Sequence, residues 1–240
     1  GPRWIRKPFD ANRAPARDRS HFTDLNRWLL KVLLLRGSPE HLWAGPRRAF
    51  HSAAELATWA EVTPPKARRS VASLEAAGFL RRGAQGLRLT RIEALMDAWL
   101  GDELRYAREE RGFQPVFSRQ ESLVLMRKEA RSELVLAGFS ACEALGLAVA
   151  APPALHLHLR KFADLDPARA DLLPCSLLDA DIVVSQPRFP ESIFRAAVPS
   201  EGLRVVDPFQ AALDVRPAPQ RGLEQAEYLR GRILEWADAR

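Results

Sequence analysis

Asp179 and Asp181 are the residues in this chain whose types and spacing first suggest chemistry. Two aspartates in an Asp-x-Asp pattern at the edge of an apolar strand can hold Mg²⁺ for phosphoryl transfer. Transfer from a nucleotide also needs a Gly-Ser turn shortly upstream to cradle the triphosphate, and residues 173–178 read LPCSLL instead. The pair therefore indicates a strand start with exposed carboxylates. We expect no enzymatic activity, and catalysis by this pair is the remote alternative.

Histidines and cysteines give a second possible site. His156 and His158 lie two residues apart on an expected strand, so they share one face and could bind a metal with Cys142 or Cys175. Because these donors are few and scattered, two partly buried histidines are a better interpretation than a metal site. We therefore predict neither a metal nor a cofactor. Two cysteines without paired spacing also argue against a disulfide framework. Reduced thiols in a cytoplasmic protein are expected.

Charge divides the chain into two parts. Residues 1–100 carry 18 of the 36 basic residues but only 9 of the 30 acidic ones, which gives them a net charge of +9 and leaves −3 for the remainder. A partner that is a polyanion should therefore meet the N-terminal part. No run approaches the length of a membrane span, and the longest apolar run, Leu29 to Leu35, is interrupted by Lys31.

The N-terminal part shows a succession of helix signals. Residues 1–22 are polar and basic without periodicity, which predicts an arm, and apolar residues recur at helical spacing over 24–36. Ser52 and Glu55 predict a capping box for a short second helix. Thr63 as N-cap and Pro64 as first helical residue predict the start of a third helix. Residues 78–90 read as two strands around a glycine-flanked turn.

The third helix and the turn supply the candidate DNA contacts. Helical spacing places Ala67, Val71 and Leu74 on a packing face and leaves another face free. A helix fits the major groove with its first turns at the base edges, and a basic hairpin can lie on the adjacent backbone. The predicted DNA-binding residues are Thr63, Lys66, Arg68, Arg69, Ser70, Ser73, Arg81, Arg82 and Arg88. The alternative is a protein-docking module with a solvated basic face.

The order of these elements, with the ending LEAAGFLRR…G…LRLT, resembles the winged helix-turn-helix of bacterial transcription regulators. The resemblance covers residues 23–92. Residues 92–111 resume helical periodicity, so a helix within the segment 93–116 is expected to link this domain to the next.

The C-terminal part, residues 117–240, mixes helix and strand signals. Helices are expected at 121–137, from Ser140 as a cap, at 209–214 and at 223–236, and strands at 154–159, 180–185 and 203–206. The expected fold class is therefore α+β, an N-terminal winged helix-turn-helix followed by a small mixed sheet with flanking helices.

The segments GFSACEALGL, LHLHL, DADIVV and above all RVVDPFQAALDV, followed by EQAEYLRGRI, resemble the C-terminal domain of AbiEi-type antitoxins. The resemblance implies a degenerate nucleotidyltransferase-like domain. It further implies a repressor that binds repeats in its own promoter and counters a partner toxin.

Together these features predict a sequence-specific repressor that binds double-stranded DNA. A cognate toxin protein and a second copy of the chain are the further partners that this interpretation allows. The alternative is a ligand-responsive winged-helix transcription factor whose C-terminal domain senses a small molecule, which would require a closed pocket with convergent polar groups.

Overall fold

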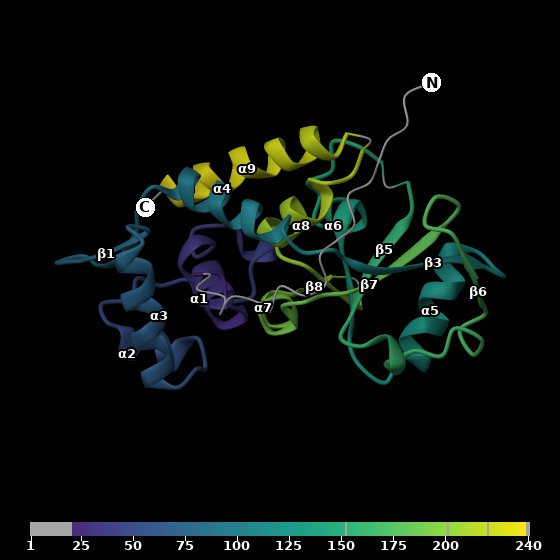
Figure 1. The fold of residues 1–240 in the computed structure, drawn as a ribbon, viewed down its shortest axis with the longest axis horizontal. Coiled ribbons are helices and arrows are strands. Elements are labelled where there is room, and N and C mark those ends of the chain that lie inside the picture. The colour runs from purple at the N-terminus through teal and green to yellow at the C-terminus, as the bar shows by residue number, and fades with distance from the viewer. Residues whose placement is uncertain (1–20, 152, 201, 220, 239–240) are drawn as a thin grey trace, which may run out of the picture.

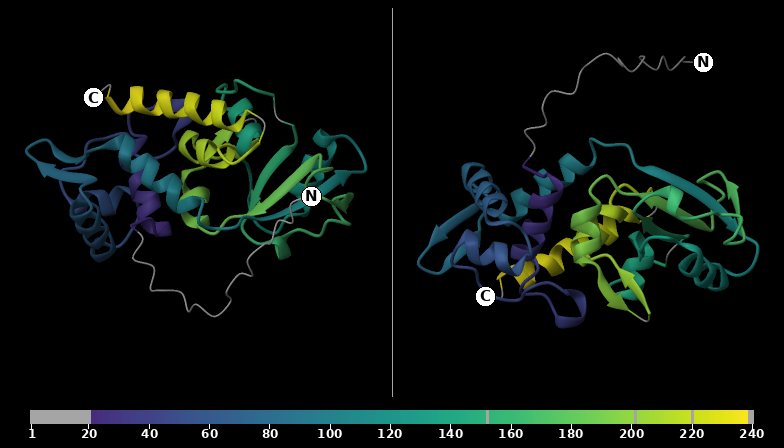
Figure 2. Two further views of the ribbon diagram at one scale, coloured as in Figure 1. Left: turned by 45° about the horizontal axis from the view of Figure 1, so that its top comes forward. Right: turned by 90° about the horizontal axis from the view of Figure 1, so that it is seen from below.

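The computed structural model describes residues 21–151, 153–200, 202–219 and 221–238. Three helices and a hairpin form one end of the molecule, and a seven-stranded sheet forms the other (Figures 1 and 2). The predicted α+β class is confirmed at this level. Among the described residues, no helix combines the length and the apolar character needed to cross a membrane. The predicted basic arm falls outside these residues, except for His21 and Phe22.

The N-terminal end follows the predicted order of elements. Its elements are α1 (Asp24–Leu34), the short 3-10 helix η1 (Glu40–Leu42), α2 (Ala53–Trp59), α3 (Pro64–Ala76), β1 (Leu80–Gly83) and β2 (Gly86–Leu89). Helix α3 begins at Pro64 as predicted, with Thr63 as an extended N-cap residue whose side chain makes no capping hydrogen bond. The capping box of α2 forms only in half, because the Glu55 carboxylate accepts from the amide of His51.

The hairpin depends on one glycine. The amide of Leu87 in β2 donates to the carbonyl of Phe50 at 2.6 Å, so the loop before α2 lies against this strand. Gly86 has a φ of +91°, and a Cβ there would lie 2.4 Å from the same Phe50 carbonyl oxygen. Both the left-handed backbone and the close approach require glycine.

Replacing Gly86 by alanine is therefore expected to lower the free energy of unfolding by about 1–3 kcal/mol, the usual cost of a strained backbone position. Urea denaturation followed by circular dichroism measures this effect. Gly83→Ala in the same turn is the matched control, because nothing lies within 4 Å of a Cβ at that position. Its change should stay within about 0.5 kcal/mol. Equal losses in the two variants would contradict the role given to Gly86.

The large sheet has the strand order β6-β3-β7-β5-β4-β9-β8, with parallel pairs β5–β7 and β4–β9 and antiparallel pairs elsewhere. Its strands are β3 (Glu109–Pro115), β4 (Leu134–Leu136), β5 (Leu155–Leu159), β6 (Leu172–Cys175), β7 (Ile182–Gln186), β8 (Val198–Ser200) and β9 (Leu203–Val205). The strands predicted at 154–159, 180–185 and 203–206 are confirmed as β5, β7 and β9.

Three predictions about helices were wrong. Helix α4 (Ile92–Glu103) ends well before residue 111, and the charged run beyond it forms β3, which pairs with both β6 and β7. Helix α5 (Arg119–Glu129) likewise ends before β4. Helix α6 (Gly138–Ala144) begins two residues ahead of the predicted cap Ser140, whose Oγ instead accepts from the amide of His156 in β5. Strands β3 and β4 pair with strands that are distant in sequence, so local periodicity did not show where the helices before them end.

Three helices run across one side of the molecule and connect its two ends (Figure 1). They are α4, α8 (Pro208–Val215) and α9 (Gly222–Asp238), and the last two confirm the predicted C-terminal helices. The Trp99 ring of α4 packs edge-on against Phe209 of α8, with centroids 4.5 Å apart. Arg230 of α9 binds Asp97 of α4. The helices therefore form one continuous layer between the hairpin end and the sheet.

Candidate nucleic-acid interface

The exposed face of α3 carries the first group of basic side chains. Lys66, Arg68 and Arg69 are all exposed near the start of the helix, as is its N-cap Thr63. Within the described part of the chain, none of these three cations forms an ion pair. The opposite face is packed, because Ala67, Val71 and Leu74 are fully buried. Helix α3 therefore presents positive charge outward while its apolar face holds it in place.

The structure removes one predicted residue from this face and gives another a structural partner. Ser70 is only 4% exposed, and its Oγ donates to Asn26 Oδ1 of α1 at 2.5 Å. Ser73 Oγ lies 2.8 Å from Nδ1 of His21. Helical spacing placed both serines with Lys66 and Arg69, but the contact with α1 covers a wider part of α3 than its apolar residues alone indicated. Ser70 is therefore a packing residue rather than a base-reading one.

The hairpin adds a second group of cations beside α3. Arg81 and Arg88 lie directly opposite each other in the register of β1 and β2, and both are exposed. Like charges in such a pair destabilise a hairpin, so an anionic partner would relieve their repulsion. The positive charge of Arg88 also acts on Arg36. The pKa of the Arg36 guanidinium is lowered mainly by burial and secondarily by this charge. Arg82 contributes less free charge, because it binds Glu75 of α3 at 2.8 Å.

Two features near α3 were missed by the sequence analysis. Trp59 of α2 is 49% exposed and lies under the guanidinium of Arg48. Arg195 of α7 (Pro190–Ala196) donates to the carbonyls of Ala60 and Glu61, at the turn between α2 and α3. Aromatic side chains on a helix usually indicate burial, and nothing local links Arg195 to a turn so far away in sequence.

Helix α1 connects this interface to the rest of the molecule through a buried lysine. Lys31 is completely buried, and its Nζ donates to Asp207 Oδ2 at 2.7 Å, to Gln210 Oε1 at 3.1 Å and to the Ser192 carbonyl at 3.2 Å. All three ammonium protons thus have acceptors. Asp207 also caps α8, since its other oxygen accepts from the amides of Phe209 and Gln210. The residue that interrupts the apolar run of α1 thereby fixes α1 to α8.

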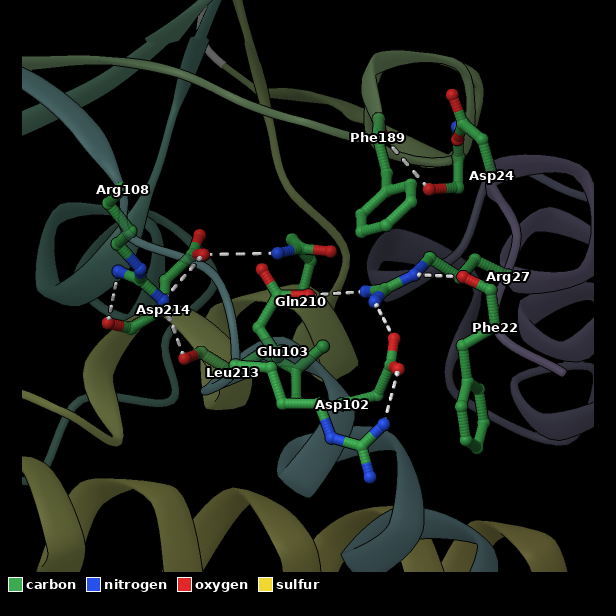
Figure 3. Close-up of polar contacts among 12 residues, drawn as sticks. Phe22, Asp24, Arg27, Asp102, Glu103, Arg108, Phe189, Gln210, Leu213 and Asp214 are labelled. Carbon is green, nitrogen blue, oxygen red and sulfur yellow. Dashed lines mark hydrogen bonds and ion pairs between the residues drawn. The ribbon is translucent and has the colours of Figure 1, made fainter. Parts of the chain in front are cut away.

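Arg27, one turn earlier in α1, makes a second buried connection (Figure 3). Its guanidinium donates to Asp102 at 2.8 Å and to Glu103, both at the end of α4, while Nε donates to the Phe22 carbonyl. The same guanidinium lies 3.8 Å from the ring centroid of Phe189. Because these partners come from distant segments, Arg27 holds the end of α4 and the loop before α7 against α1.

Asp24 completes the attachment of α1. Its two carboxylate oxygens accept from the backbone amides of Glu191 and Ser192 in the first turn of α7, at 2.9 and 2.7 Å. A carboxylate at this position satisfies helix amides that would otherwise lack acceptors. Residues 26–34 of α1 are all buried. The basic face of α3 is thus mounted on a helix that is anchored at three points to the C-terminal part.

A second polar cluster lies behind this junction. Asp214 of α8 binds His158 Nε2 of β5 at 2.9 Å and accepts from the Gln210 amide group at 3.0 Å. Arg108 donates to the carbonyls of Leu213 and Asp214 (Figure 3). Burial alone would raise the pKa of Asp214, but His158, Arg108 and Gln210 together lower it to about 2. His158 is therefore a partner of a buried carboxylate.

Asparagine at position 214 should reveal this lowered pKa. A carboxylate whose pKa falls from 3.8 to about 2 on folding stabilises the fold above about pH 4, and this contribution is lost as pH falls toward 2. Asp214→Asn lacks the ionisable group, so the stability difference between wild type and variant should narrow over that range. Urea unfolding at a series of pH values measures the difference. A gap that stays constant from pH 7 to pH 2 would contradict the assignment.

The structure also shows the surroundings of the aspartate pair and of the histidine and cysteine residues that the sequence analysis considered as chemical sites. Asp181 binds Arg119 at 2.6 Å, and Asp179 accepts from Ser176 Oγ at 2.6 Å. Both carboxylates are thus engaged by protein groups in the exposed region after β6. Cys142 is buried, which raises its thiol pKa to about 12. The residues that the structure describes contain no group of three or more histidine, cysteine or acidic side chains arranged to hold a metal.

Comparison of the chain with known protein families, with curated proteins and with solved structures finds no match.

Proposed function

We propose that this protein is a sequence-specific DNA-binding regulator in which α3 enters the major groove and the β1–β2 hairpin acts as a wing. The observation that carries the proposal is the concentration of exposed cations on these two adjacent elements. Lys66, Arg68 and Arg69 on α3, with Arg81 and Arg88 on the hairpin, form no ion pair within the described part of the chain. Such a surface suits the phosphates and base edges of a duplex.

The arrangement of helices supports this proposal. Helix α2 packs against α3, and α3 precedes a two-stranded antiparallel hairpin, as expected for a winged helix-turn-helix. The resemblance of the C-terminal segments to AbiEi-type antitoxins extends the proposal to a repressor of its own promoter that counters a partner toxin. The proposal assigns no catalytic step to Asp179 or Asp181. A second copy of the chain would bind a neighbouring repeat.

A binding experiment on DNA tests the proposal. Purified protein is titrated into a labelled duplex from the region upstream of its own gene and into a scrambled duplex of equal length, at about 50 and 200 mM salt. Retardation of the upstream duplex that persists at the higher salt concentration is expected. Equal and salt-labile binding to the two duplexes would show that the basic surface attracts DNA without regard to sequence. This result would contradict sequence-specific regulation.

A further inference from the structure

A cavity of about 150 Å³ lies behind the junction between α1 and the C-terminal part. One wall is the segment that leads from α4 into β3, with Glu103 and Tyr106, and the other is the loop between β7 and α7, with Arg188 and Phe189. His158 of the Asp214 cluster also lines it. The cavity therefore combines two aromatic rings, a buried imidazole and the arginines Arg108 and Arg188. Three carboxylates also line it, and each is bound by another side chain: Glu103 by Arg27, Glu109 by Gln186 and Asp214 by His158.

Arg188 is the cation that could hold an anionic ligand. Its guanidinium lies 3.8 Å from the ring centroid of Tyr106 and 5.7 Å from that of Phe189. The two rings meet edge to face with centroids 5.9 Å apart. Within the part of the chain that the structure describes, Arg188 has no carboxylate partner. An exposed arginine stacked on aromatic rings keeps its planar donors available for a carboxylate.

His158 supplies a hydrogen-bond position at the same cavity. It is 5% exposed, and its Nε2 faces the carboxylate of Asp214. In the neutral ring the proton therefore lies on Nε2, which leaves Nδ1 as an acceptor. Nδ1 is buried and has no hydrogen-bond partner among the described residues. Buried polar atoms are normally paired, so a donor from a ligand would complete this site.

We propose that this cavity binds a small aromatic carboxylic acid that carries a ring hydroxyl. A cavity of this volume accommodates a single six-membered ring. The ligand carboxylate would bind Arg188, the ring would lie against Tyr106 and Phe189, and the hydroxyl would donate to Nδ1 of His158. This is a non-covalent sensor site, and no bond is made or broken in it.

The cavity walls are attached to the proposed DNA-reading helix through α1. Glu103 and Phe189, on opposite walls, both contact Arg27, and Gln210, which also lines the cavity, accepts from Lys31. Helix α1 in turn holds α3 through the hydrogen bond between Asn26 and Ser70. A ligand that changes the separation of the walls would therefore move α1 and, with it, α3. This coupling rests on the proposed function.

Titration calorimetry with 4-hydroxybenzoate as the probe tests the site directly. Saturable binding of one molecule per chain is expected. Benzoate lacks the hydroxyl and 4-hydroxybenzyl alcohol lacks the carboxylate, so each should bind about tenfold more weakly or worse. Arg188→Gln, an exposed substitution compatible with folding, should weaken binding of the probe by a similar factor. Arg232→Gln is the control, because Arg232 also stacks on an aromatic ring, that of Trp236, away from the cavity.

Absence of saturable binding, or equal binding by wild type and Arg188→Gln, would overturn the site. Regulation is measured separately, as the change in DNA affinity at saturating 4-hydroxybenzoate, and a change of at least about fivefold is expected. If the protein binds DNA but its affinity for DNA is unchanged by 4-hydroxybenzoate, the coupling is overturned. A wild-type protein that binds no DNA would instead contradict the proposed function. Calorimetry would still show whether the cavity binds 4-hydroxybenzoate.

Discussion

Replacing Lys31 by methionine should lower the free energy of unfolding by about 3–5 kcal/mol, because the variant leaves Asp207 buried without its counter-ion. Both side chains are completely inaccessible to solvent, and Nζ satisfies three acceptors from α7 and α8. For a chain of this size the loss corresponds to a melting temperature lower by roughly 6–20 °C. Denaturant unfolding and scanning calorimetry measure the two quantities.

Two controls separate the lost ion pair from a general effect of methionine. Lys66→Met changes an exposed lysine of α3 and should alter stability by no more than about 0.5 kcal/mol. The double variant Lys31→Met/Asp207→Ser removes both charges and keeps a side chain that can cap α8. It should recover much of the loss, because the buried unpaired charge is gone. A Lys31→Met protein as stable as wild type would show that this pair does not hold α1.

Replacing Arg69 or Lys66 by alanine should weaken binding to the specific duplex by about 1–3 kcal/mol each, or roughly 5- to 150-fold. Both side chains are exposed on α3, and alanine favours helix, so folding should be unaffected. A residue that reads a base loses discrimination between specific and scrambled DNA. One that contacts a phosphate weakens both and reduces the salt slope by about one. Fluorescence anisotropy over a range of salt concentrations distinguishes these cases.

Arg169→Ala is the matched control for this pair of variants, since Arg169 is 71% exposed and lies on the sheet end of the molecule. Its DNA affinity should equal that of wild type. If Arg69→Ala and Lys66→Ala also bind the specific duplex as wild type does, α3 is not the reading helix.

Local sequence signals were enough to predict the N-terminal end. Thr63 and Pro64 mark the start of α3, because that dipeptide suits only the first positions of a helix. The glycine-flanked turn after residue 82 likewise predicted the hairpin. Strand β3 was missed because its charged sequence does not alternate, and its pairing partners β6 and β7 follow about 60 or more residues later in the chain.

The surface cations of the candidate interface were predictable, but the buried junction was not. Helical spacing identified Lys66 and Arg69 correctly as exposed residues of α3, and misplaced Ser70 because a small polar side chain gives little indication of its burial. Lys31 looked only like an interruption of an apolar run. Its partner Asp207 lies 176 residues away, and no pattern along the chain connects the two. The polar cavity beside His158 is likewise assembled from four separate stretches of the chain, within residues 103–109, 158, 185–193 and 210–214.

The measurement that tests the central claim most directly is selection of bound duplexes from a random DNA pool. Wild-type protein, Lys66→Ala and Arg69→Ala are carried through the same rounds, and the enriched sequences are compared. If α3 reads base edges, as proposed, the wild type should enrich one motif, and each variant should lose preference at particular positions within it. A wild-type pool that remains random, or a motif that is unchanged in both variants, would contradict the assignment of α3 as the reading helix.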